Sequence, residues 1–182
     1  MRSLKEVFGL NPFTLRQLIK RKEWGKVMLK LQGKSGCIEA RTNFKGGMTP
    51  LHRACVLQPP FNVIDALIEI APRSIMTSDI FGRLPLHEAC QFMVSEGIVD
   101  RLIQHYPNGA YSQDRQGKTP LHYAVASACT HGSAGLDAVV QLANVAPDSI
   151  YIMDQNGDTP LDIALCQGNR TAKKVVAFLR SL

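Results

Sequence analysis

Apolar residues recur every three to four positions in several short segments of the chain, and each such segment predicts an amphipathic helix. The pattern is clearest in NVIDALIEIA (62–71), GIVDRLIQHY (97–106), LDAVVQLANVA (136–146) and AKKVVAFL (172–179). Proline directly follows the first three segments, at positions 72, 107 and 147, and a proline just past a helix marks its end. The pattern therefore predicts four short helices at regular spacing.

A second helix is predicted before each of these segments, because four nearly identical motifs occupy those positions. The motifs are GMTPLHRAC (47–55), GRLPLHEAC (82–90), GKTPLHYAV (117–125) and GDTPLDIAL (157–165). Threonine is a good N-cap and proline is favoured at the first helical position, so each motif predicts a helix start. The motif glycines are 35, 35 and 40 residues apart. The five extra residues belong to ACTHGSAG (128–135), which we interpret as a loop insertion in one unit.

Short polar segments separate the two-helix units. DIFG (79–82), DRQG (114–117) and DQNG (154–157) combine Asp with Gly, which favours a tight turn with one residue at positive φ. Three positions depart from the repeated pattern: Phe44 stands where the other turns have Asp, Leu84 replaces the motif Thr, and Asp162 replaces the motif His. The local hydrogen bonding at these three positions is left open by the sequence.

A unit of two helices and a turn, repeated every 33 to 35 residues with TPLH at its start, resembles the ankyrin repeat. The resemblance covers residues 43–182 and depends on four copies that agree in register. It implies an all-α ankyrin-repeat solenoid of stacked helix-turn-helix units with connecting β-hairpin-like turns. We expect four repeats in one continuous array, at about 43–77, 78–112, 113–152 and 153–182.

Residues 1–42 are expected to form an N-terminal segment with a degenerate capping helix pair. The segment 13–33 has no TPLH motif, but its apolar residues keep helical spacing while its Lys and Arg residues face outward. The inward positions are Leu15, Leu18, Ile19, Val27, Met28 and Leu31. A terminal repeat needs a polar outer face, which explains the basic character of this pair.

Two His–Cys pairs, His52 with Cys55 and His87 with Cys90, lie three residues apart on predicted helices and suggest a metal site or an activated thiol. The other units place Val125 and Leu165 in the cysteine position, which indicates a buried apolar slot. A zinc site needs three or four convergent ligands, so a structural role is the better interpretation. No phosphate-binding loop or GxSxG motif is present. We therefore expect no catalytic residue, no cofactor, no metal and no enzyme activity, with cysteine redox chemistry as the weaker enzymatic alternative.

The net charge of +6 is distributed unevenly. Residues 1–46 contain 11 Lys/Arg and 3 Asp/Glu, whereas the rest of the chain is slightly acidic. A basic end of this kind could bind nucleic acid or an anionic membrane surface, or it could be the solvated face of a capping helix. The five cysteines form no CxxC pair, and the chain has no run of about 18 apolar residues. Its first residues lack a continuous apolar stretch, so we expect no secretory signal. We expect an intracellular protein, cytoplasmic or nuclear.

The resemblance implies a non-catalytic protein–protein interaction module that binds its partner on the concave face formed by turns and first helices. Phe81 and Phe92 are the expected anchors, and Arg83, Arg115 and Lys118 are expected to meet acidic groups; alternatively, Phe81 folds back onto a neighbouring turn. We expect a protein partner, no small-molecule substrate and a monomer. The predicted contact residues are Met48, Ile80, Phe81, Arg83, Phe92, Arg115, Gln116, Lys118, Gln155 and Asn156.

Overall fold

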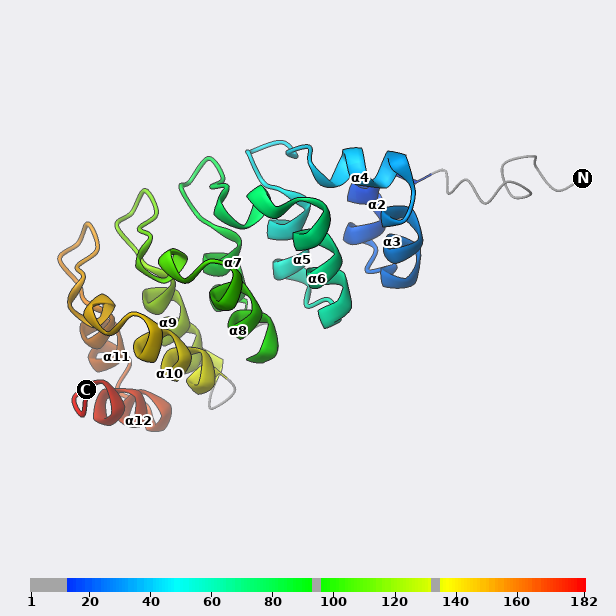
Figure 1. Cartoon of the computed structure of the whole chain (residues 1–182). Coiled ribbons are helices and arrows are strands. Elements are labelled where there is room, and N and C mark those ends of the chain that lie inside the picture. The colour runs from blue at the N-terminus through cyan, green and yellow to red at the C-terminus, as the bar shows by residue number, and fades with distance from the viewer. Residues whose placement is uncertain (1–12, 93–95, 132–134) are drawn as a thin grey trace, which may run out of the picture.

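The computed structural model describes residues 13–92, 96–131 and 135–182, and within these ranges the chain is helical without a β-strand (Figure 1). Helices pair along the chain, and the pairs stack beside one another from the N-terminal to the C-terminal end. The helix pairs are α2 (Leu15–Lys20) and α3 (Trp24–Leu31), α5 (Pro50–Leu57) and α6 (Phe61–Ile70), α7 (Pro85–Gln91) and α8 (Glu96–His105), α9 (Pro120–His131) and α10 (Leu136–Val145), and α11 (Pro160–Gln167) and α12 (Arg170–Leu179).

We call α5, α7, α9 and α11 the inner helices and α6, α8, α10 and α12 the outer helices. Figure 1 looks onto the outer helices, with the inner helices behind them. The turns at 44–48, 79–83, 114–118 and 154–158, here called finger turns, project from one edge of the stack. Each is preceded by a connector, which is a 3-10 helix in three units: η1 (Pro72–Met76), η2 (Pro107–Tyr111) and η4 (Pro147–Tyr151).

The inner helices all begin at the motif proline, as the sequence predicts. Thr49 caps α5 through its hydroxyl, which accepts a hydrogen bond from the backbone N–H of His52. In return, Nδ1 of His52 accepts the backbone N–H of Thr49 at 3.1 Å. Leu84 has no hydroxyl, yet its backbone N–H still donates to Nδ1 of His87 at 3.0 Å. The histidine therefore preserves half of the cap where threonine is missing.

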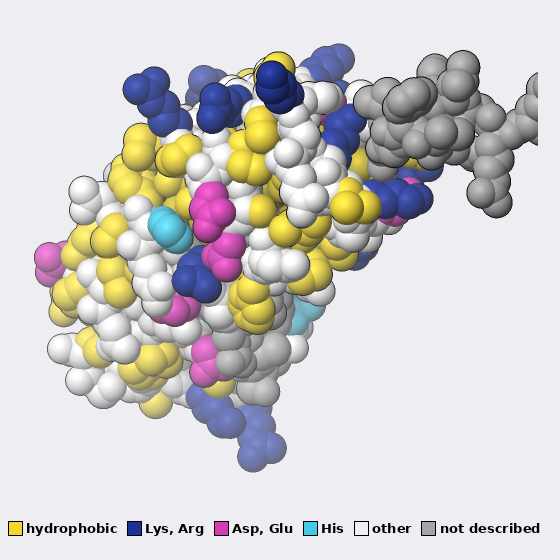
Figure 2. Space-filling model, turned by 45° about the vertical axis from the view of Figure 1, so that its right-hand side comes forward, with side chains coloured by type: hydrophobic (Ala, Val, Ile, Leu, Met, Phe, Trp, Pro, Cys, Tyr) yellow, Lys and Arg dark blue, Asp and Glu magenta, His cyan; other side chains and the backbone are white. Residues whose placement is uncertain are grey.

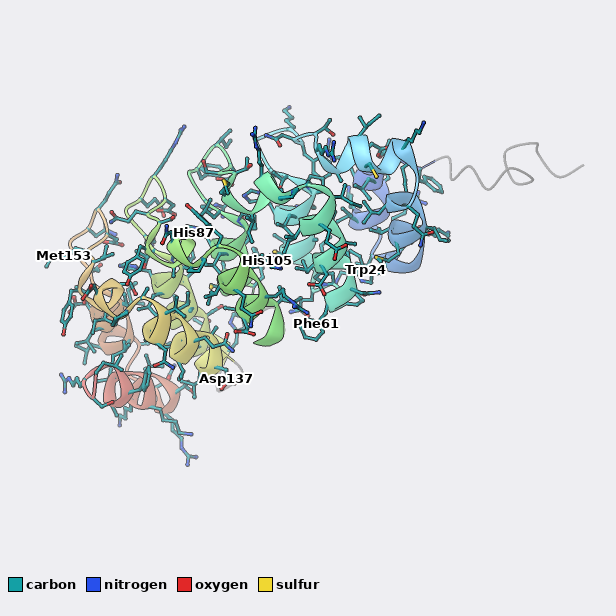
Figure 3. The ribbon with its side chains drawn as sticks, viewed as in Figure 1. Trp24, Phe61, His87, His105, Asp137 and Met153 are labelled. Atoms are coloured by element: carbon teal, nitrogen blue, oxygen red, sulfur yellow. The ribbon has the colours of Figure 1, made fainter. Side chains whose placement is uncertain are left out.

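His52, His87 and His122, which occupies the same position in the next unit, join consecutive units. Because Nδ1 accepts a backbone N–H, the proton of the neutral ring is on Nε2, which donates to a carbonyl of the next unit. His87 lies inside the stack in Figure 3. The Nε2-to-oxygen distances are 2.9 Å from His52 to Arg83, 3.2 Å from His87 to Lys118 and 3.2 Å from His122 to Asp158.

Three of the four finger turns are closed by buried aspartates, and the first has Phe44 in that position. Oδ1 of Asp79 accepts the backbone N–H groups of Phe81 and Arg83 at 2.8 and 2.9 Å, and Asp114 and Asp154 repeat the pattern. Neighbouring turns also pair, since the N–H of Arg115 donates to the carbonyl of Phe81 at 2.8 Å. Gly117 has φ +77°, and a Cβ there would lie 3.0 Å from the backbone nitrogen of Gln155. Glycine thus permits both the turn and its close neighbour.

One apolar core runs through the whole stack. Its residues include Leu67, Leu102 and Leu142 from outer helices and Leu121 from an inner helix, all at most 1% exposed. The position of Cys55, Cys90 and Val125 is also buried in each internal unit, but Leu165 in the last unit is 47% exposed. Each unit therefore covers the apolar side of the one before it, as expected for a solenoid.

One element differs from the sequence prediction. Residues 128–131 of the supposed loop insertion extend α9 by about one helical turn, and residues 132–134 lie outside the described ranges. The first connector is an α-helix, α4 (Lys34–Ala40), where the other three units have a 3-10 helix. Glu39 holds it in place, because its carboxylate accepts the backbone N–H of Leu15 and pairs with Lys30 at 3.1 Å. These long-range contacts cannot be read from local spacing.

Candidate partner-binding face

The inner helices lie side by side and form the inner face, which contains a cavity of about 800 Å³. Volumes of this order are typical of ligand and peptide sites. The cavity spans all four motif-bearing units and is lined by Gln58, Gln91, Phe92, Lys118, His122, Tyr123, Ala126, Ser127, Thr130, His131 and Ile163. Its walls therefore combine aromatic, amide, hydroxyl and basic groups.

The extension of α9 builds one wall of this cavity. Thr130 and His131 belong to the extra turn, and the Thr130 hydroxyl lies 2.8 Å from Nδ1 of His131. The extended helix is tied to its neighbours on both sides: Ser127 donates to the carbonyl of Gln91 at 2.6 Å, and Asn169 donates to the carbonyl of Cys129 at 2.6 Å. Residues 128–131 are thus a fixed part of the inner face.

Arg83 lies at the edge of the inner face and is held by two buried carboxylates. Its Nη2 is 3.0 Å from Oδ2 of Asp79 and 2.9 Å from Oε1 of Glu88. Burial raises the pKa of Glu88 although Arg83 opposes the rise. Burial opposes ionisation of Asp79 too, but the hydrogen bonds from Arg83 and Phe81 and the charge of Arg83 together outweigh it and lower the pKa of Asp79. The guanidinium also lies 5.0 Å from the centre of the Phe81 ring. The charge of Arg83, which we expected to meet a partner's acidic groups, is compensated within the chain.

We expect Arg83→Ala to lower the free energy of unfolding by about 3 kcal/mol, because it leaves Asp79 and Glu88 buried without their cation. Urea denaturation at neutral pH measures the change. Arg115→Ala serves as the control, since Arg115 is exposed and removing it should change stability by about 0.5 kcal/mol or less. Equal stability of the two variants would show that the buried ion pairs do not form.

Tyr123 connects the cavity to a smaller hollow of about 180 Å³ beneath the finger turns. Its hydroxyl donates to Oδ2 of Asp114 at 2.6 Å, and its ring meets His87 edge-on at 5.9 Å between centroids. Burial, and then the bond to Asp114, raise the pKa of Tyr123 above its usual range. The smaller hollow is lined by Phe81, Arg83, Asp114, Arg115, Gln116 and Tyr123.

The structure brings six of the ten predicted contact residues to these two hollows. Phe81 and Phe92 are 56% and 42% exposed, so neither ring is hidden by a neighbouring turn. Lys118 lines the large cavity, with its Nζ 3.9 Å from Oδ2 of Asp154. The six are Phe81, Arg83, Phe92, Arg115, Gln116 and Lys118; the four that line neither hollow are Met48, Ile80, Gln155 and Asn156.

Sequence reasoning missed Tyr123 and the extra turn of α9. One signal for Tyr123 was available, because the position after the motif histidine holds Arg53, Glu88, Tyr123 and Ile163 in the four units. A position that accepts such different side chains is not part of the uniform apolar core. No comparable signal existed for Thr130 and His131, because only one unit contains the insertion.

The His–Cys pairs do not form a reactive site. Cys55 and Cys90 are buried, and burial raises the pKa of both thiols far above the range of an activated nucleophile. Within the described residues, no group of three or more His, Cys, Asp or Glu side chains is arranged to hold a metal ion. Both pairs contribute to packing and to the joints between units.

The fold and the inner face together define a helical repeat solenoid. The family model for ankyrin repeats (3 copies) matches residues 57–142 and 92–181, so the chain belongs to the ankyrin repeat family. Ankyrin repeats are generally protein–protein interaction modules and are typically non-catalytic. A search of curated proteins gave no match. Among the described helices, none has the length and apolar content needed to cross a bilayer.

Proposed function

We propose that this protein is a non-catalytic interaction module that binds an extended protein segment on its inner face, inside the cell. The observation that supports this most strongly is the 800 Å³ cavity on that face, with the exposed ring of Phe92 at its edge. Exposed aromatic side chains next to a hollow are frequent binding hot spots.

The cavity lining suits a peptide backbone. Gln58 donates one amide N–H to the carbonyl of Phe92 and Gln91 accepts one from Arg83, both at 3.3 Å, and each amide has further donor and acceptor capacity for a peptide group. The hydroxyl of Ser127 already donates to the carbonyl of Gln91. Lys118 and the exposed Arg115 provide positive charge at the side of the cavity near the finger turns. We therefore expect a partner segment with an apolar side chain for the Phe92 region and an acidic group near Lys118 and Arg115.

The alternative, an adaptor for nucleic acid or an anionic membrane acting through residues 1–46, has less support. Several basic side chains of that segment have internal partners: Lys26 and Arg21 pair with Glu23, and Lys30 pairs with Glu39. Residues 1–12 lie outside the described ranges. A salt titration with generic RNA, DNA and acidic vesicles separates the two proposals, since phosphate binding weakens steeply with salt.

We expect Phe92→Ala to weaken partner binding about 30-fold, which corresponds to a hot spot of about 2 kcal/mol. The measurement is the affinity of the purified variant for a partner first captured by the wild-type chain from the source cell.

Phe61→Ala is the matched control for this variant. Phe61 is 48% exposed, close to the value for Phe92, but it begins the outer helix α6 and lies at the lower end of that helix in Figure 3. The control should retain full affinity. If both variants bind as the wild type does, Phe92 is not an anchor; if only Phe61→Ala loses binding, the partner lies on the outer face.

A further inference from the structure

A second cavity, of about 460 Å³, lies between the first connector and the second. It has no lining residue in common with the inner-face cavity. The cavity lies between the end of α4 and η1, on the edge of the stack that bears the finger turns. Lys and Arg side chains gather along this edge in Figure 2. The lining consists of Ala40, Arg41, Asn43, Thr49, Ile70, Ala71, Pro72, Arg73, Ser74 and Thr77.

Two arginines and no acidic residue line this cavity. Nε of Arg41 donates to the carbonyl of Ile70 at 3.0 Å, so one guanidinium is anchored at the wall. Within the described residues neither Arg41 nor Arg73 forms an ion pair. This pair of arginines occurs only at this junction, because the later connectors have other residues at both positions. The position of Arg41 is occupied by Met76, Tyr111 and Tyr151, and the position of Arg73 by Asn108 and Asp148.

Ser74 provides an independent indication of a ligand site. Its residue is 6% exposed, and its buried hydroxyl has no hydrogen-bond partner in the described part of the chain. Ser149 occupies the same position two units later and donates its hydroxyl to the carbonyl of Ala146 at 2.6 Å. A buried hydroxyl without a partner is costly, and an anionic oxygen in the cavity would remove that cost.

We propose that this cavity binds a small phosphate monoester. Two guanidinium groups match the charge of a phosphate dianion and can donate paired hydrogen bonds to its oxygens. Asn43, Ser74 and Thr77 add polar groups, and Ala40, Ile70 and Pro72 form an apolar wall for the organic part of the ligand. The volume falls in the range of small-molecule sites, about 300 to 1,000 Å³. This inference is independent of partner binding on the inner face.

Calorimetric titration of the full chain with phenyl phosphate, at low salt, tests the proposal. We expect saturable binding to the wild type and a loss of about tenfold or more in Arg41→Gln and in Arg73→Gln, because each removes charge-assisted hydrogen bonds. Arg170→Gln, which changes an exposed arginine on α12, is the matched control and should bind as the wild type does.

Ser74→Ala gives a second readout that does not depend on charge. It should weaken phenyl phosphate binding about threefold or more while leaving the free protein at least as stable as the wild type, because the unpaired hydroxyl is gone. Benzoate should bind more weakly than phenyl phosphate. Absence of binding at millimolar phenyl phosphate, equal binding of benzoate, or full affinity in Arg73→Gln would each overturn the proposal.

Discussion

Lowering the pH from 7 to 5 should destabilise the protein, and His87 alone should account for about 2 kcal/mol of the loss. Burial lowers the pKa of His87 from 6.5 to about 4, and burial also lowers the pKa of His52 and His122. All three rings are neutral in the folded state and accept a backbone N–H at Nδ1, which a protonated ring cannot do.

The sign of the effect follows from proton binding. Below pH 6.5 the unfolded chain binds protons at these histidines while the folded chain does not. Their contribution to the free energy of unfolding is therefore fully present above that pH and is lost as the pH falls toward 4. Glu88 acts in the opposite direction, because its pKa is raised in the folded state and its protonation favours folding. The three histidines outnumber it, so a net loss is expected.

Urea denaturation at a series of pH values measures this loss. His87→Gln is the informative variant, because glutamine stays neutral at every pH. The free energy of unfolding of this variant should depend less steeply on pH between 6.5 and 4 than that of the wild type. Stability that stays constant from pH 7 to 5, or an unchanged pH dependence in His87→Gln, would mean that these histidines are accessible to protons in the folded state.

Leu121→Ala should lower the free energy of unfolding by about 2 to 5 kcal/mol, the usual cost of truncating a buried leucine. Leu121 is fully buried, because α9 is packed between α7 and α11. Leu161 holds the same position in the last unit, where it is only half-buried. Leu161→Ala should therefore cost about half as much or less.

The pair of leucines tests the stacking of units directly, since the two residues have the same motif position and differ in their neighbours. Chemical denaturation of both variants gives the two costs. Equal losses would contradict the finding that each unit is buried by the one that follows it.

The repeat architecture could be predicted from sequence because all four units have the same sequence pattern. Pro50, Pro85, Pro120 and Pro160 mark the inner-helix starts, and four agreeing copies remove the ambiguity of any single motif. The extent of α9 could not be predicted in this way, because ACTHGSAG occurs once and its glycines favour a loop.

The arrangement of the proposed binding face could be predicted from sequence only in part, for a physical reason. The exposure of Phe81 and Phe92 follows from their positions in the repeat, but the pairing of Arg83 with Glu88 depends on how the finger turn folds over α7. Arg41 and Arg73 are likewise brought together only by the stacking of two connectors. Periodicity places residues on a face, whereas ion pairs and cavities between units depend on side-chain packing.

The most direct test of partner binding on the inner face is hydrogen–deuterium exchange of the purified chain, alone and saturated with its captured partner. We predict that the partner slows exchange in residues 80–92 and 115–131 and leaves the outer helices α6, α8 and α10 nearly unchanged. Slower exchange confined to those outer helices, or to residues 13–46, would contradict the proposed site.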